Sequence, residues 1–261
     1  MERTPMTRAD WRSPGAYEDL RSLDAPSFAW EYLRRNPEFQ RHCKKLERAA
    51  RQGALDQAEV DAFARRWGLQ FREHYQDKPA PLIVWSALAL PSVIALTKLP
   101  ADLADPQFRL PSLALGAGLT ADGAERLVEC RGAVLRVHID EVGIEPPSVL
   151  LPLDQLFEIR AIAAIRLWRC LTGRSLGPNP AALSKARRDR LILALRALDG
   201  RLADLTYREI AAGLFGPGDV PERGWKSHDL RDRTMRLVRF GRGMMQHDYR
   251  HLLLHPYRRR S

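Results

Sequence analysis

The sequence predicts a mainly α-helical protein with a small β unit. Three observations predict it: apolar residues recur at helix spacing towards both ends, prolines are frequent between residues 79 and 152, and a hairpin pattern lies among those prolines. We expect a helical N-terminal region, a β-hairpin-containing middle and an all-helical C-terminal domain of a helix-turn-helix variant. Hydrophobic residues make up 45% of the 261 positions and charged residues 28%, which is typical of a folded globular protein.

The N-terminal region contains residues that typically begin and end short helices. Residues 24–27, Asp-Ala-Pro-Ser, form a helix-start signal, and Asn36-Pro37 is expected to end the helix that follows. A further helix is predicted from Leu55 to Trp67, with Gly68 as its C-terminal stop.

The middle region predicts strands. Leu127–Cys130 and Ala133–Ile139 flank Arg131-Gly132, which is the pattern of a hairpin. The apolar run Pro81–Leu99 approaches the length of a membrane span, but Pro91 interrupts it. We therefore expect a buried strand and a short helix there rather than a transmembrane segment.

Prolines at 146, 147 and 152 predict a domain boundary, so we expect one domain at residues 1–150 and another at residues 151–261. In the second domain a helix is predicted over Leu153–Leu171. Ser184 is predicted to cap another helix that ends at Asp199-Gly200.

Charge is distributed unevenly along the chain. The net charge is +10, and residues 160–261 alone hold 22 Lys and Arg against 9 Asp and Glu, a local charge of +13. Such an excess indicates a polyanionic partner for the C-terminal region, with nucleic acid as the first candidate and an anionic membrane surface as the second. A soluble protein that is merely rich in arginine is the alternative interpretation.

Residues 206–216, TYREIAAGLFG, have the features of the first helix of a helix-turn-helix. Thr206 and Glu209 are spaced as a capping box. The small residues Ala211, Ala212 and Gly213 would let a second helix cross closely. The stretch PGDVPERGWK that follows is longer than the usual turn of this motif, so we expect a variant turn or a wing-like element.

The next helix is predicted to begin near Ser227 as its N-cap. One face of that helix is apolar and consists of Leu230, Thr234, Leu237, Val238, Gly241 and Met245. The opposite face carries Asp232, Arg236 and Arg239, and it is flanked by Arg231, Arg233 and Arg242. Because arginine binds both guanine and phosphate and a helix fits the major groove, we predict that this element binds DNA. The predicted DNA-binding residues are Lys226, Ser227, His228, Arg231, Arg233, Arg236, Arg239 and Arg242.

The region from about Pro152 to Leu254 resembles the RovC-like DNA-binding domain family. The segments that carry the resemblance are LPLDQLFEIRAIAAIRLWRCLTGR, LTYREIAAGLFG and LRDRTMRLVRFGRGMMQHDYRHLL. The segment DWRSPGAYEDLRSLDAPSFAWEYLRRNPEF, followed later by ARRWGL, resembles the transcriptional-regulator-like domain that often precedes it.

The resemblance implies a bacterial transcription factor with a helix-turn-helix variant. It also implies a link to type VI secretion or to the excision and transfer of integrative conjugative elements. The family includes antiactivators that bind a partner regulator rather than DNA, and this is the alternative function. The two-part layout favours an activator.

A DNA recombinase is a weaker alternative, because His247-x-x-Arg250 followed by Tyr257 is superficially similar to a tyrosine recombinase site. The spacing from Arg250 to Tyr257 is short for a nucleophile on a separate element. His247, His251 and His255 lack further ligands for a metal. We therefore expect a protein that is not an enzyme and has no cofactor or metal.

The three cysteines, at positions 43, 130 and 170, form no Cys-x-x-Cys pair. This favours a reducing compartment and disfavours a disulfide scaffold or zinc ribbon. With no apolar leader after Met1, we expect a cytoplasmic protein. The expected partners are double-stranded DNA, a second copy in a homo-oligomer, and a regulator or antiactivator protein, but not a membrane.

Overall fold

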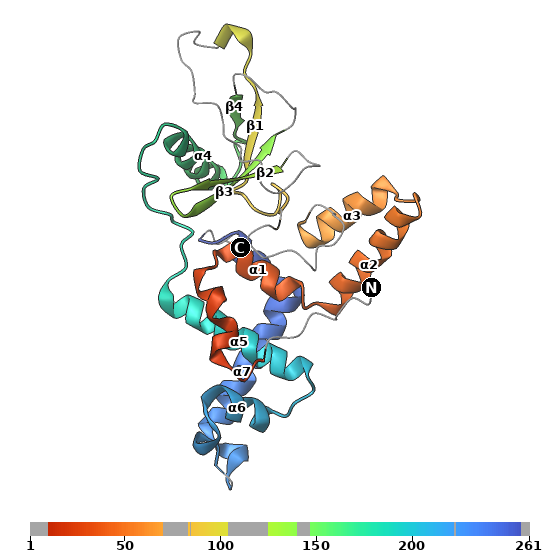
Figure 1. Cartoon of the computed structure of the whole chain (residues 1–261), viewed down its shortest axis with the longest axis vertical. Helices are drawn as coiled ribbons and strands as arrows, with labels where there is room; N and C mark the ends of the chain where they lie inside the picture. The colour runs from red at the N-terminus through yellow and green to blue at the C-terminus, as the bar shows by residue number, and fades with distance from the viewer. Residues whose placement is uncertain are drawn as a thin grey trace. The chain divides into compact units, whose positions relative to one another are not determined.

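The computed structural model describes residues 10–69, 83, 85–103, 125–139, 147–221 and 223–256. Within these ranges the chain is mainly helical and contains one four-stranded sheet, which confirms the predicted fold class (Figure 1). The chain divides into two compact units that are discontinuous in sequence. We call residues 1–37 with 182–252 the helical unit, and residues 38–181 with 253–261 the sheet unit. A boundary at residues 150 and 151 stays a prediction.

The helical unit combines an N-terminal segment with the C-terminal helices. The segment contains the 3₁₀-helix η1 (Pro14–Ser22) and the helix α1 (Ala25–Leu33). The C-terminal part contains α5 (Lys185–Leu202), α6 (Tyr207–Phe215), α7 (Asp229–Gly243), the π-helical turn η7 (Met244–Asp248) and α8 (Arg250–Leu253).

Side-chain caps begin three of these helices, as the sequence predicts. The Asp24 carboxylate accepts a hydrogen bond from the Ser27 N–H, and the Ser184 hydroxyl accepts one from the Arg187 N–H. Thr206 and Glu209 form both bonds of the capping box. The Thr206 backbone N–H thereby holds the pKa of the Glu209 carboxyl below its ordinary value. α5 continues two residues past the predicted stop at Gly200.

Helices α5 and α7 cross at close range. A Cβ atom at Gly241 would lie 2.8 Å from the carbonyl oxygen of Ala194 and 3.0 Å from the Cβ of Leu198. Only glycine therefore allows this approach. The predicted crossing at residues 211–213 is wrong in its detail, because Gly213 faces the indole ring of Trp11 from the N-terminal segment rather than another helix.

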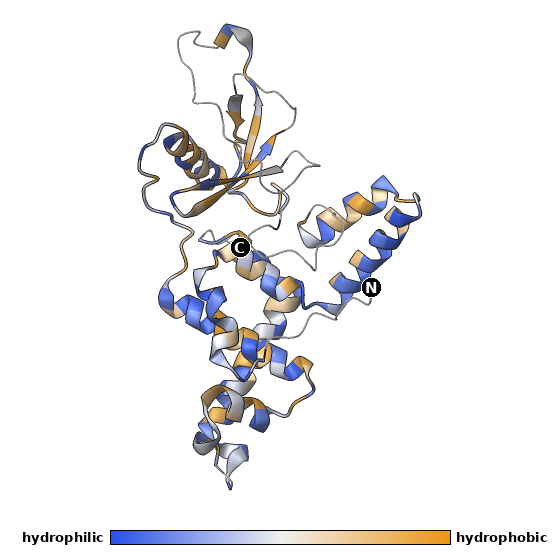
Figure 2. Cartoon of the chain, in the orientation of Figure 1, coloured by the Kyte–Doolittle hydropathy of each residue, from blue (hydrophilic) through white to orange (hydrophobic). Residues whose placement is uncertain are grey.

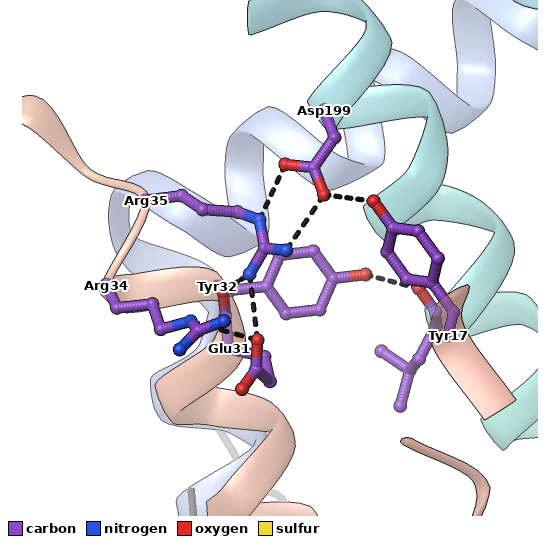
Figure 3. Close-up of polar contacts among 7 residues, drawn as sticks. Tyr17, Glu31, Tyr32, Arg34, Arg35 and Asp199 are labelled. Atoms are coloured by element: carbon purple, nitrogen blue, oxygen red, sulfur yellow. Dashed lines mark hydrogen bonds and ion pairs between the residues drawn. The ribbon is translucent and has the colours of Figure 1, made fainter. Parts of the chain in front are cut away.

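A buried polar cluster fastens the N-terminal segment to α5 (Figure 3). The Asp199 carboxylate accepts hydrogen bonds from the Tyr17 hydroxyl at 2.6 Å and from Nε and an Nη of Arg35 at 2.6 and 2.8 Å. The Glu31 carboxylate, itself buried, binds Arg35 at 2.9 Å. Burial, and then the charge of Asp199, raise the pKa of Tyr17, so its hydroxyl stays protonated as a donor.

Two further contacts extend this attachment along α5. Tyr32 is fully buried and donates its hydroxyl to the Leu191 carbonyl at 2.8 Å. The buried Arg196 guanidinium donates to the carbonyl oxygens of Trp11 and Arg12 at 2.9 and 2.8 Å, and also to that of Gly213 at 3.2 Å. Arg196 therefore joins the N-terminal segment, α5 and α6.

The sheet unit begins with a pair of helices, α2 (Pro37–Arg51) and α3 (Gln57–Trp67). Figure 2 shows that α2 is largely hydrophilic, and its buried residues are few. Phe39 packs on Phe63 and Trp67, with ring centroids 5.8 and 5.5 Å apart. Gly68 ends α3 in the left-handed conformation at φ 77°, as predicted.

The sheet has the strand order β2-β3-β1-β4. Its strands are β1 (Ile94–Lys98), β2 (Glu125–Cys130), β3 (Ala133–Ile139) and β4 (Pro147–Leu150). β2 and β3 form the predicted hairpin, β1 is parallel to β3, and β4 is antiparallel to β1. A short 3₁₀-helix, η4 (Ala101–Leu103), follows β1.

Helix α4 (Phe157–Leu171) covers one face of the sheet. Its residues Ala163 and Leu167 join a core with Ile94, Val128 and Val137 of the strands. This packing produces one disulfide, which the spacing of the cysteines did not lead us to expect. It brings the ends of β2 and α4 together, where Cys130 and Cys170 form a disulfide with a Cα–Cα distance of 6.1 Å. Spacing alone could not reveal a pair that lies 40 residues apart in sequence.

The apolar run at residues 81–99 contains the predicted strand, β1, but not the predicted short helix in its described part. Residues 87–89 and 91–92 form turns instead, because Pro91 interrupts the backbone hydrogen bonding that a helix needs. Among the helices that the structure describes, none combines the length and apolar character required to cross a bilayer.

We predict that Asp199→Ala lowers the free energy of unfolding by about 3–5 kcal/mol, because it leaves the Arg35 guanidinium, whose side chain is only 15% exposed, without its main counter-charge. Chemical unfolding followed by circular dichroism would measure the change. Arg21→Ala is the matched control, since its ion pair with Asp189 joins the same two segments but is exposed. Equal effects of the two substitutions would contradict a central role for the buried cluster.

We predict that Gly241→Ala destabilises the protein, although alanine normally favours a helix over glycine by about 1 kcal/mol. The added methyl group would meet the Ala194 carbonyl and force α5 and α7 apart, which costs about 1–3 kcal/mol. The melting temperature measured by calorimetry should fall. A rise would show that the crossing is looser than described.

Candidate nucleic-acid interface

The candidate interface lies on α6, α7 and the segment between them. Residues 216–228 connect the two helices and include two short 3₁₀ turns, η5 (Pro217–Asp219) and η6 (Trp225–Ser227). Gly216 and Gly224 have φ values of 110° and 75°, which glycine adopts readily. Val220 is buried, and an Nη of Arg208 donates to the Pro221 carbonyl at 3.0 Å. The connection is therefore a shaped loop attached to α6.

The inner face of α7 is the predicted apolar face. Thr234, Leu237, Val238 and Gly241 are buried, and Leu230 is half-buried. Leu237 and Val238 pack in one core with three residues of the neighbouring helices, namely Ala194, Ala197 and Ile210. This packing fixes which side of α7 remains for solvent.

The outer side of α7 presents four exposed arginines at three-residue intervals, Arg233, Arg236, Arg239 and Arg242. Each three-residue interval turns the side chain by about 60° from the one before, so the row spreads over about half of the helix circumference, with Arg236 and Arg239 at its middle. Among the residues that the structure describes, no carboxylate forms an ion pair with any of these four side chains. The Arg233 guanidinium lies 4.5 Å from the centroid of the Phe215 ring, which limits its freedom.

Arg231 differs from the other predicted arginines. It is half-buried, and its guanidinium lies 3.5 Å from the Asp232 carboxylate. This neighbouring carboxylate offsets part of its charge. Arg231 therefore presents less net charge to a polyanion than the four arginines of the outer row.

The start of α7 corrects the predicted N-cap. His228, not Ser227, is the N-cap, and its Nδ1 accepts a hydrogen bond from the Leu230 N–H at 3.2 Å. Ser227 belongs to η6 and donates its hydroxyl to the Gly224 carbonyl at 3.2 Å. Lys226 is exposed in the same turn. The structure thus brings the three predicted residues together, but the Nδ1 of His228 is already engaged.

Sequence reasoning missed a contribution from α5. The Arg190 guanidinium is exposed and lies 4.8 Å from the centroid of the Phe240 ring on α7. A shallow pocket of about 390 Å³ is also present, lined by Tyr207, Met235, Val238, Arg239, Arg242, Gly243 and Gln246. Both features depend on how α5 and α6 cross α7, and a residue pattern within one helix carries no signal for them.

Tyr257 and the terminal arginines 258–260 lie outside the described residues. His247 and His251 lie in η7 and α8, and both are exposed. Within the described ranges, no three His, Cys, Asp or Glu side chains lie together in a group that could hold a metal ion.

Comparison with protein families gives two matches. Residues 150–254 match the RovC DNA-binding domain, whose description reads "T6SS, Transcription factor, DNA binding domain". Residues 10–72 match the proteobacterial transcriptional regulator-like domain. Among curated proteins, none matches the chain significantly.

The first match includes the whole of the candidate interface, from α5 to α7, and the second includes η1, α1, α2 and α3. Their order along the chain is the order that the sequence resemblance indicates. The two matches support a transcription regulator in which a region similar to the proteobacterial transcriptional regulator-like domain precedes a region similar to the RovC DNA-binding domain.

Proposed function

We propose that this protein binds specific sites on double-stranded DNA and regulates transcription there, with α7 as the helix that enters the major groove. The observation that carries the proposal is the exposed arginine row of α7 behind a fully packed inner face. A helix whose apolar face is already covered presents its polar face as a rigid unit, and guanidinium groups bind both phosphates and guanine.

The dimensions of the row suit a duplex. From Arg233 to Arg242 the helix advances about 13 Å, at roughly 1.5 Å per residue. Base pairs in B-DNA are about 3.4 Å apart, so the row would extend over about four of them. Arginines on opposite margins of such a row would reach the phosphates, and those in its middle would reach base edges.

Acidic residues on the same helix would add selectivity. Asp229 and Asp232 are both exposed on α7. A carboxylate accepts a hydrogen bond from the amino group of cytosine but is repelled by phosphate. Their presence supports a surface that discriminates between sequences rather than one that binds every polyanion equally.

The connection between α6 and α7 supports a helix-turn-helix variant. Residues 216–228 replace the usual short turn, and this loop exposes Lys226 at the start of α7. There the positive end of the helix dipole would favour a phosphate. We propose that the loop fixes the register of α7 on the duplex through this contact.

We further propose that the protein activates transcription and that secretion genes are among its targets. The family description includes T6SS, and this supports secretion genes as targets. The separate regulator-like domain supports activation of transcription, because it supplies a surface beyond the DNA-binding helices. A promoter-reporter assay with and without the protein would give the sign of regulation.

We predict that the purified full chain enriches a small set of intergenic sites with a common motif from sheared genomic DNA of its source organism, at near-physiological salt. Sequencing of the recovered DNA is the measurement. Uniform recovery that disappears as salt rises would indicate only nonspecific charge attraction. No recovery at any salt would favour the alternative of an antiactivator that binds a partner protein.

We predict that Arg236→Ala and Arg239→Ala each weaken binding to a recovered site by about 1–3 kcal/mol if they contact a base, since a bidentate contact is worth that much. A residue that contacts phosphate would instead reduce the slope of log affinity against log salt by about one. Fluorescence anisotropy titrations over a salt series would separate these effects.

Arg65→Ala is the matched control for these variants, because Arg65 is an exposed arginine on α3. It removes the same charge without touching α7. Wild-type affinity in both α7 variants would exclude this helix as the DNA reader. An equal loss in Arg65→Ala would attribute the effect to net charge alone.

A further inference from the structure

The pocket of about 390 Å³ in the helical unit has the composition of a small-molecule site. It lies where α6 begins beside α7 (Figure 1). Its volume falls within the usual range of ligand pockets, which combine an apolar wall with a few polar groups. We call it the α6–α7 pocket, because Tyr207 of α6 lines one side and six residues of the segment 235–246 line the other.

The α7 side of the pocket follows from the spacing of its residues. Intervals of four, three and four residues align a stripe along one side of the helix, made of Met235, Arg239, Arg242 and Gln246. This side is the margin between the buried inner face of α7 and its outer arginine row. The pocket therefore shares Arg239 and Arg242 with that row, whereas its other lining residues lie outside the row.

Tyr207 supplies the opposite wall. It is the first residue of α6, and the capping box of Thr206 and Glu209 beside it fixes the start of this helix. The Tyr207 side chain packs against the core that contains Val238, and the Arg201 guanidinium lies 5.8 Å from the centroid of its ring. A ring held in this way is a preformed surface on which a flat ligand can stack.

The pocket ends where α7 passes into the π-helical turn η7. The Tyr249 N–H donates to the Met244 carbonyl, five residues back, at 3.2 Å. Such turns are rare and often occur at functional sites. This one carries the exposed Gln246 amide at the pocket rim. A Cβ atom at Gly243 would lie 2.5 Å from a carboxylate oxygen of Asp248, so that carboxylate lies against this end of the pocket.

The pocket suits an anion that has an apolar body. Over the described part of the chain, no carboxylate forms an ion pair with Arg239 or Arg242. A guanidinium binds a carboxylate through two parallel hydrogen bonds. Phosphate would leave the apolar wall unused, whereas an aromatic body would cover it and stack on Tyr207. The Asp248 carboxylate would repel an acid group from the η7 end, so the acid group would lie towards Arg239.

We propose that the α6–α7 pocket binds a small aromatic carboxylic acid, and that the bound acid excludes DNA from Arg239 and Arg242. The ligand site stands on the pocket alone, whereas its antagonism of DNA binding rests on the function proposed above. Two ligands that need the same guanidinium groups compete, so each lowers the apparent affinity of the other. The pocket thus gives the regulator a way to respond to a small acid.

The first test titrates 2-naphthoate into the full chain with its methionine methyl groups labelled with carbon-13. The chain has five methionines, of which Met235 lines the pocket and Met244 and Met245 are buried outside it. We expect a saturable shift of the Met235 resonance, with a dissociation constant of about 1 mM or below for a ligand of this size. The Met244 and Met245 resonances should shift less, and Met235→Leu identifies the pocket signal.

Two further probes separate the charge from the aromatic body. 2-Naphthamide has the same rings without the charge, and inorganic phosphate has the charge without the rings. Each should bind at least about tenfold more weakly than 2-naphthoate, because each lacks one of the two contacts. Equal binding of phosphate would reduce the pocket to a simple anion site, and equal binding of 2-naphthamide would remove the arginines from recognition. Either result overturns the proposal.

Variants test whether the ligand lies in the pocket. Tyr207→Ala should weaken 2-naphthoate binding about tenfold or more, because stacking is lost, and Gln246→Ala should weaken it less. Gln52→Ala is the matched control, because Gln52 is an exposed glutamine of the sheet unit, and it should bind as wild type does. Circular dichroism checks folding, and the exposed Gln246 tests the pocket without disturbing the core. Wild-type binding in both pocket variants would place the ligand elsewhere.

The second test measures the affinity for a recovered DNA site by fluorescence anisotropy. With 2-naphthoate at ten times its measured dissociation constant, we expect DNA binding by wild type to weaken about tenfold. Sodium chloride at equal ionic strength is the comparison, since DNA binding depends on salt. The same concentration should weaken binding by Tyr207→Ala only about twofold, because its pockets would be about half filled.

The outcomes separate this proposal from the proposed function. Absence of a Met235 shift up to about 10 mM 2-naphthoate would overturn the ligand site. Saturable binding without loss of DNA affinity would overturn the antagonism. A chain that binds 2-naphthoate but recovers no DNA would support the ligand site and contradict only the proposed function.

Discussion

The helical unit depends on the buried carboxylate of Asp199. Asp199 lies on α5 and receives three hydrogen bonds from the N-terminal segment, one from Tyr17 and two from Arg35. A buried carboxylate without such partners would be costly, and a buried guanidinium equally so. The pair therefore fixes both how the segment lies on α5 and which side of α5 remains for α7. Because α7 packs on that remaining side of α5, the direction in which its arginine row points is set as well.

Local features of the structure could be predicted from the sequence, because they depend on neighbouring residues. The capping box at Thr206, the left-handed stop at Gly68 and the buried face of α7 each follow from spacing over a few positions. The arginine row of α7 could be predicted from the sequence for the same reason. The N-cap at Ser227 was wrong by one residue, because the η6 turn absorbs that serine.

Features formed by distant residues could not be predicted. The Tyr17–Asp199 bond joins positions 182 residues apart, and no periodicity indicates it. The Cys130–Cys170 disulfide depends on α4 lying across the sheet, and the Arg190–Phe240 contact depends on the α5–α7 crossing. In each case single residues from separate elements meet, and a lone residue in a sequence does not identify its partner.

The discontinuity of the helical unit has a consequence for protein synthesis. Residues 1–37 leave the ribosome first, but α5 begins only at Lys185. At the usual rate of about 5–20 residues per second, the segment waits about 7 to 30 seconds for its partner. During that time the apolar side chains of Trp11, Phe28 and Trp30, all buried in the finished fold, lack the helices that cover them. These side chains therefore stay without their packing partners while the sheet unit is being made, and the helical unit is completed only after nearly the whole chain has emerged.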